Sequence, residues 1–153
     1  MRPSSPGDTV PRMGGRYGMS FAAELMEKGN YEEAIDAATT AMEARKDNPE
    51  PFADRAAAYD YLERYAEAVA DLEKALALNA AAPVIDQDDL DDAFFSALVS
   101  ASKIEAETSV AAAVTLLARY GQVLPAGRHV RDSEDWRKRF RGELKSLLDK
   151  TTD

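Results

Sequence analysis

Cysteine is absent from this chain of 153 residues, and lysine and arginine are outnumbered by aspartate and glutamate. Without a thiol, the chain cannot form a disulfide, a thiolate zinc site or a cysteine nucleophile. The net charge of −9 argues against nucleic-acid binding, because contacts to phosphates require a basic surface. We therefore expect no nucleic acid among the partners.

Long apolar runs are also missing. No stretch approaches the roughly 18 to 20 apolar residues needed to cross a bilayer, and residues 1–20 alternate proline, glycine, serine and arginine where a signal peptide would be apolar. We expect no membrane interaction and a cytoplasmic location. The apolar content of 45% is typical of one folded domain. Residues 1–15, rich in proline and glycine, are predicted to form a flexible tail.

An internal repeat with a spacing of 34 residues follows the tail. The matched pairs are Ala22 and Ala56, Ala23 and Ala57, Leu25 and Tyr59, Tyr31 and Tyr65, Glu33 and Glu67, Ala34 and Ala68, Ile35 and Val69, Ala41 and Ala75, and Met42 and Leu76. Each copy contains two amphipathic segments joined by a short turn, at 28–30 and 63–64. Small residues such as Ala34, Ala41 and their partners are expected where two helices approach closely.

The repeat resembles the tetratricopeptide repeat (TPR), a helix-turn-helix unit. In the second copy, the family's tryptophan, glycine, tyrosine, alanine and phenylalanine positions carry Phe52, Ala56, Tyr59, Ala68 and Leu72. The first copy is more degenerate, with Gly18 and Ala38 at the tryptophan and phenylalanine positions. The resemblance implies a right-handed α-solenoid and a protein-interaction role.

A third unit is predicted from amphipathic segments at 91–102 and 105–120. If Ala111 corresponds to Ala68, the spacing is 43 residues and about nine extra residues fall within 83–92. A last helix is expected to begin near Ser133, with Trp136, Phe140, Leu144 and Leu147 on one apolar face. We predict an all-α fold of about three repeats at 16–125 with a C-terminal capping helix at 126–153.

Catalytic signals are weak. His129 is the single histidine, and the sequence indicates neither a partner nor a pocket for it. We expect no enzyme activity and no cofactor. The acidic cluster Asp86, Asp88, Asp89, Asp91 and Asp92 does not have the spacing of an EF-hand loop. It is either the favoured N-terminus of a helix or a weak divalent-cation site, and no metal ligand is assigned.

The family resemblance also implies a groove lined by the first helix of each repeat. Relatives that bind the acidic tails of heat-shock chaperones hold the terminal carboxylate with lysine and asparagine, whereas this chain has Met19, Ala23 and Asp54 at those positions. We therefore expect no carboxylate clamp. The candidate groove residues are Met19, Ala23, Met26, Glu50, Asp54, Ala57, Asp60 and Tyr61. Their acidity favours a basic or amphipathic ligand, although Met19 and Met26 would alternatively face the core.

Three functions remain open at this point. The first is an adaptor or scaffold that holds one protein partner in the groove. The second is a small chaperone for an export or assembly client, because acidic three-repeat proteins of this size resemble secretion chaperones. The third is a structural protein that self-associates through apolar solenoid edges.

Overall fold

The computed structural model describes residues 20–151, without the side chains at 147 and 151. The expected tail at 1–15 and the groove candidate Met19 therefore lie outside the described residues. Residues 20–151 form seven helices and no strand. The helices are α1 (Phe21–Glu27), α2 (Tyr31–Ala44), α3 (Glu50–Tyr61), α4 (Tyr65–Ala81), α5 (Gln87–Ala106), α6 (Val110–Val123) and α7 (Val130–Thr151). The predicted all-α fold is confirmed.

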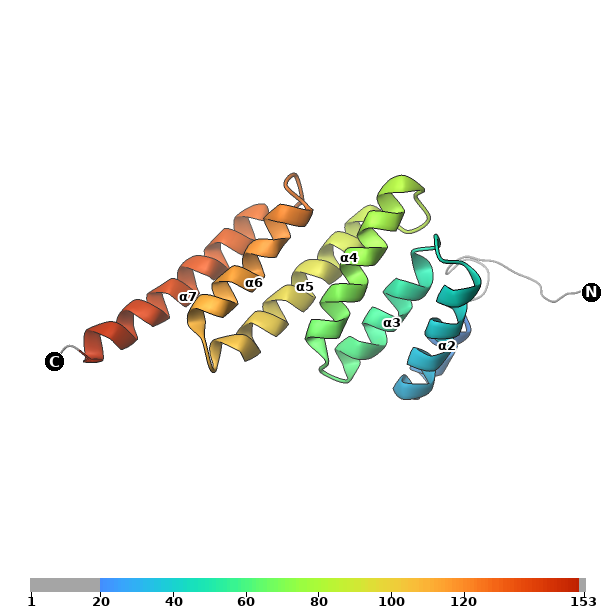
Figure 1. Ribbon diagram of the computed structural model, residues 1–153, viewed down its shortest axis with the longest axis horizontal. Helices are drawn as coiled ribbons and strands as arrows, with labels where there is room; N and C mark the ends of the chain where they lie inside the picture. Colours follow the sequence, from blue (N-terminus) through green and yellow to red (C-terminus); the bar gives the residue numbers. More distant parts are fainter. Residues whose placement is uncertain (1–19, 152–153) are drawn as a thin grey trace, which may run out of the picture.

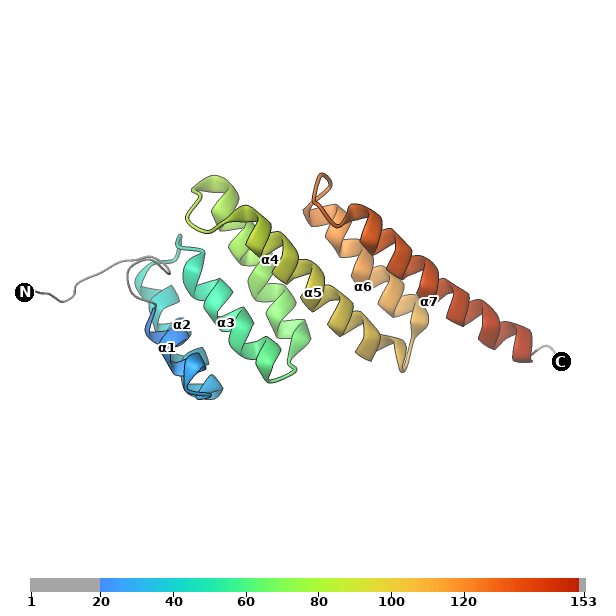
Figure 2. The same cartoon turned by 180° about the vertical axis from the view of Figure 1, so that it is seen from behind.

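The helices form a row of antiparallel hairpins in two layers (Figures 1 and 2). We call the layer of α1, α3, α5 and α7 the A layer and that of α2, α4 and α6 the B layer. Each helix packs on the next one along the chain, and within the A layer α1 contacts α3 while α5 contacts α7. The main contacts between helices are all of these two kinds, which is the arrangement of an α-solenoid.

Short turns close the first two hairpins. Gly29 has φ +81° in the first turn, a left-handed conformation that glycine adopts at no steric cost. Glu63 occupies the same place 34 residues later, with φ 60°. Residues with a side chain rarely adopt a positive φ. The packing of the repeat therefore imposes a backbone conformation on Glu63 that the residue by itself would not favour.

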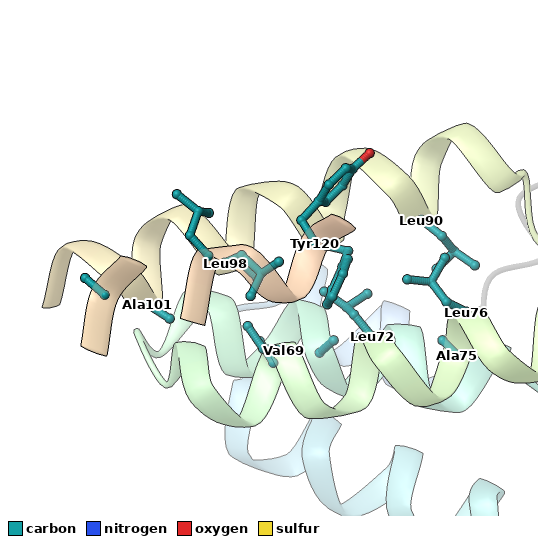
Figure 3. Packing of buried hydrophobic residues seen from close by; sticks show 14 of the residues in the cluster. Val69, Leu72, Ala75, Leu76, Leu90, Leu98, Ala101 and Tyr120 are labelled. Atoms are coloured by element: carbon teal, nitrogen blue, oxygen red, sulfur yellow. The ribbon is translucent and has the colours of Figure 1, made fainter. Parts of the chain in front are cut away.

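The main hydrophobic core extends from α3 to α7, and a smaller cluster joins α1, α2 and α3. Figure 3 shows Leu76 of α4 and Leu90 of α5 pointing toward one another within the main core. Its largest fully buried side chains include Phe94, Leu98, Leu117 and Tyr120. The core is therefore centred on the second and third repeats.

One predicted close approach is wrong. Ala34, Ala68 and Ala75 are fully buried, but Ala41 is exposed. In an antiparallel hairpin that turns at 28–30, the residue opposite Ala41 would precede the start of α1 at Phe21. Since α1 has only seven residues and α3 has twelve, α1 does not reach the end of α2 as α3 reaches the end of α4.

The register of the third repeat also differs from the prediction. Ala113 is fully buried and takes the place of Ala68, whereas Ala111 is exposed. The extra residues do not form a longer connection, because both the α2–α3 and α4–α5 connections contain five residues. They lengthen α5 to 20 residues, against 12 in α3, and α4 to 17, against 14 in α2.

The last helix begins at Val130, earlier than the predicted Ser133, whose side chain is buried inside the first turn. Phe140 is buried and Trp136 is partly buried against the main core, as the predicted apolar face requires. The face is not covered along its whole length. Leu144 is 37% exposed because α7 has 22 residues and α6 only 14. None of the helices within residues 20–151 is long and apolar enough to span a membrane.

Candidate functional site

An apolar groove separates α3 from α5 in the A layer and has a volume of about 270 Å³. We call it the α3–α5 groove. Most of its lining residues are small or aliphatic, and two carboxylates join them. The lining residues are Ala53, Ala56, Ala57 and Asp60 of α3, Leu72 of α4, Ile85 of the α4–α5 connection, and Asp89, Leu90, Ala93, Ser96 and Ala97 of α5.

The α3 wall is positioned by Arg55. Its Nε and Nη2 atoms donate to the two carboxylate oxygens of Asp71 on α4, each at 2.8 Å. Its Nη1 donates to Thr39 Oγ1 on α2 at 3.1 Å. A bidentate pair of this kind fixes orientation as well as distance. Arg55 thus holds three helices together and turns Ala56 and Ala57 toward α5.

The α5 wall is positioned by Asn79, a buried residue near the end of α4. Its side-chain oxygen accepts hydrogen bonds from the backbone N–H of Val84 and of Ile85, and its amide donates to the Ile85 carbonyl. Asp86 then caps α5 by accepting from the Asp89 N–H at 3.1 Å. These local contacts satisfy the backbone of the connection and place Ile85 and Asp89 at the groove.

Asp60 and Asp89 carry the charge of the groove. Both are exposed at its rim, one on each wall. Within residues 20–151, neither carboxylate forms an ion pair, and every acidic side chain that does form one lies outside the groove. Asp60 is exposed as a residue, but its carboxyl group is partly desolvated, which raises the pKa of Asp60 above its ordinary value. The groove is therefore an apolar slot with uncompensated negative charge at its edges.

Asp54 lies on the neighbouring face of α3, turned toward α1. Its Oδ2 accepts a hydrogen bond from Ser20 Oγ at 2.7 Å. Burial raises the pKa of Asp54 to about 6, the hydrogen bond from Ser20 partly opposes that rise, and the charge of Glu50 adds to it. Above pH 6, Asp54 is therefore a charged carboxylate in a desolvated position, and this charge lowers the stability of the folded protein.

This cost predicts that Asp54→Asn stabilises the protein at high pH. The folded-state pKa lies above the unfolded value of about 4, so the folded protein binds the proton more tightly and its stability falls as pH rises from about 4 to above 6. Asparagine keeps an acceptor for Ser20 without the charge. We expect a gain of about 1 to 3 kcal/mol at pH 8 that largely disappears by pH 4, measured by urea unfolding.

Asp36→Asn, on the exposed face of α2, is the control for this measurement and should shift stability by no more than about 0.5 kcal/mol. A stability difference between Asp54→Asn and the parent that is the same at pH 4 and pH 8 would show that Asp54 is not desolvated.

The other predicted groove residues do not share one site. Ala57 and Asp60 line the α3–α5 groove. The remaining described candidates lie on the α1 side of α3 or on α1 itself, with Ala23, Met26, Glu50 and Asp54 all half-buried. Met26 packs against the smaller core cluster. Tyr61 is 66% exposed and stacks on Tyr31, with 4.9 Å between ring centroids.

Sequence reasoning missed the α5 wall. The sequence feature that indicates this wall is a set of three small residues at helical spacing on α5, Ala93, Ser96 and Ala97. They match three small residues with the same spacing on α3, namely Ala53, Ala56 and Ala57. Small residues were interpreted only as points of close helix contact. Here their short side chains leave the space between the two walls unfilled, which forms the groove.

Most of the acidic residues at 86–92 form contacts with other residues of the same chain. Asp91 is buried and accepts hydrogen bonds from Tyr120 Oη and from the Arg128 N–H. Asp92 faces His129 Nε2 at 2.7 Å, and Arg128 pairs with Asp88 at 3.4 Å. No group of three or more potential ligands in residues 20–151 is placed to hold a metal ion. The cluster attaches the α6–α7 connection to α5.

His129 has both ring nitrogens engaged. Its Nδ1 faces Asp132 at 3.0 Å, and its ring stacks on Phe95 with 4.4 Å between centroids. Burial lowers the pKa of His129, but the hydrogen bonds to Asp132 and Asp92 outweigh this and raise it above its ordinary value. These contacts give the imidazole a structural role at the α6–α7 corner, outside the α3–α5 groove.

The paired antiparallel helices and their repeat match solved structures of one kind. One is the second TPR domain of human RPAP3, in complex with an HSP70 peptide, with 19% identity over 78% of this chain and 88% of that chain and a TM-score of 0.50. The chain has the fold of a TPR domain. The N-terminal domain of stress-induced protein-1 from C. elegans aligns over 75% of this chain and 87% of that chain, at 17% identity and a TM-score of 0.52. No protein-family model matches the sequence, and no curated protein matches it significantly.

Proposed function

We propose that this TPR chain is a protein-interaction module that binds a basic or amphipathic segment of another protein on the A layer. The fold supports a binding role, since the similar TPR domain of human RPAP3 holds an HSP70 peptide. The observation that carries the proposal is the acidic character of α3. Asp60 lines the apolar groove, whereas Glu50 and Asp54 lie on the adjacent side of the helix, toward α1. None of the three forms an ion pair among residues 20–151.

The partner differs in charge from the peptide bound by RPAP3. That peptide, SGPTIEEVD, is acidic. Carboxylate recognition requires cationic or amide donors, and of the clamp positions that the structure describes, Ala23 offers none and Asp54 is itself a carboxylate. Like charges across an interface suppress a partner, whereas opposite charges favour it. The module therefore selects basic segments.

A peptide-binding experiment tests this selection. Three fluorescein-labelled probes would be titrated at about 0.15 M salt: a 14-residue amphipathic peptide of leucine and lysine, its leucine–glutamate counterpart, and SGPTIEEVD. We expect the leucine–lysine peptide to bind at least about tenfold more tightly than either acidic probe, with an affinity that falls as salt is raised.

Variants locate the effect on α3. Asp60→Asn combined with Asp54→Asn should weaken binding of the leucine–lysine peptide, whereas Glu43→Gln, on the exposed face of α2, should leave it unchanged. Equal or tighter binding of SGPTIEEVD, or an equal loss in the Glu43→Gln control, would refute the proposal.

A further inference from the structure

The chemistry of the α3–α5 groove is more specific than a preference for basic segments. Its floor and walls are apolar, formed by Leu72, Leu90, Ile85 and a row of alanines. Its rim has a carboxylate on each side, Asp60 and Asp89. A ligand group that fits both parts needs an aliphatic stem and a cationic end.

The size of the groove is also suitable. An engineered protein cavity of about 150 Å³ is large enough to hold benzene, and this groove has about 270 Å³. Because alanine is the smallest side chain with a Cβ, the walls supplied by Ala53, Ala57 and Ala93 leave room for a long unbranched side chain from outside. Lysine and arginine both bury an aliphatic stem along apolar surface while their charged ends reach polar groups.

We infer that the α3–α5 groove is a receptor for one lysine or arginine side chain of the partner, whose stem lies on the alanine walls and whose cation meets Asp60 and Asp89. This inference rests on the proposed function and adds the anchoring residue and its location. It also assigns a binding role to α5, in addition to α3.

The charge distribution around the groove supports a cation from outside the chain. Arginine side chains of this protein already pair with several of the acidic side chains of α4 and α5. Arg55 pairs with Asp71, Arg119 with Glu73 and Arg128 with Asp88. Among the residues that the structure describes, no lysine or arginine lines the groove. Within residues 20–151, Asp60 and Asp89 are thus left without a cation beside an apolar slot.

Three small probes with the same alkyl chain test the inference on the full-length protein. Hexylammonium mimics a lysine side chain, 1-hexanol removes the charge, and hexanoate reverses it. Binding would be followed by chemical-shift changes of ¹⁵N-labelled protein at pH 7. We expect hexylammonium to bind about fivefold more tightly than 1-hexanol, the gain of one exposed ion pair, with shifts centred on Ala57, Asp60, Asp89 and Ser96.

Matched variants separate charge from shape. Asp60→Asn with Asp89→Asn should reduce the affinity for hexylammonium to that for 1-hexanol. Asp88→Asn changes charge at the neighbouring position of α5, which does not line the groove, and should have little effect. Ala93→Leu narrows the groove at an exposed position and should weaken binding of both hexylammonium and 1-hexanol.

Each outcome bears on one claim. Equal binding of hexylammonium and 1-hexanol, shifts outside α3 and α5, or no effect of the paired Asp60 and Asp89 variant would overturn the lysine receptor. If the leucine–lysine peptide still binds in that case, the proposed function stands and only the anchor is wrong. If hexylammonium binds as expected but no basic peptide does, the anchor chemistry stands and the proposed function fails.

Discussion

Phe94→Ala is expected to lower the free energy of unfolding by about 3 to 5 kcal/mol, the usual cost of emptying a buried aromatic site. Phe94 is fully buried in the main core, and its ring lies 6.1 Å from that of Tyr120, centroid to centroid. It sits on α5, which packs on both α4 and α6. The cavity would therefore weaken two helix interfaces at once. Urea unfolding followed by circular dichroism measures the loss.

Phe21→Ala provides the matched control, because Phe21 is 68% exposed at the start of α1. Its removal should change stability by no more than about 0.5 kcal/mol. A Phe94→Ala variant that unfolds at the same urea concentration as the Phe21→Ala variant would contradict the position of the main core.

Gly127→Ala is expected to cost about 2 to 4 kcal/mol, although glycine to alanine is usually a mild change. A Cβ on Gly127 would lie 2.2 Å from Tyr120 Oη and 2.9 Å from Leu124 Cβ. Tyr120 Oη cannot move freely, because it donates to the buried Asp91 and accepts from the His129 N–H. Relief of the clash would break hydrogen bonds of a buried carboxylate, so the α6–α7 corner should loosen.

Two other glycines give the contrast. Gly121 in α6 and Gly142 in α7 have nothing within 4 Å of a built Cβ, so Gly121→Ala and Gly142→Ala should each stabilise by up to about 1 kcal/mol through helix propensity. In a Tyr120→Phe background, Gly127→Ala should cost less than in the parent, because the hydroxyl is gone. Purely additive losses in this double-mutant cycle would show that the Gly127 and Tyr120 contact is not the cause.

The candidate site could be predicted only in part. The resemblance to the TPR family, which implies a groove lined by the first helix of each repeat, predicted Ala57 and Asp60. Asp54 and Tyr61 were grouped with them, but the structure directs Asp54 toward Ser20 and stacks Tyr61 on Tyr31. Asp89, Ala93 and Ser96 were not identified as groove residues, since no pattern within α5 shows which neighbouring helix its small residues will face.

Sequence by itself determined the helices and their pairing. The spacing of 34 residues requires the α1–α2 and α3–α4 hairpins to have the same design, and small residues at Ala34 and Ala68 are buried in both. These properties are local or repeated, so they follow from periodicity and turn chemistry.

Only the tertiary structure shows which elements contain the extra residues of the third repeat, and that the long helix α5 faces α3 across the groove. A sequence can absorb them in a loop or in a helix, and here α4 and α5 take them because Asn79 and Asp86 close the connection after five residues. The α3–α5 groove results from that choice. Its walls belong to helices that barely touch, joined through α4, so only the packing of all three could bring Asp60 and Asp89 to one opening.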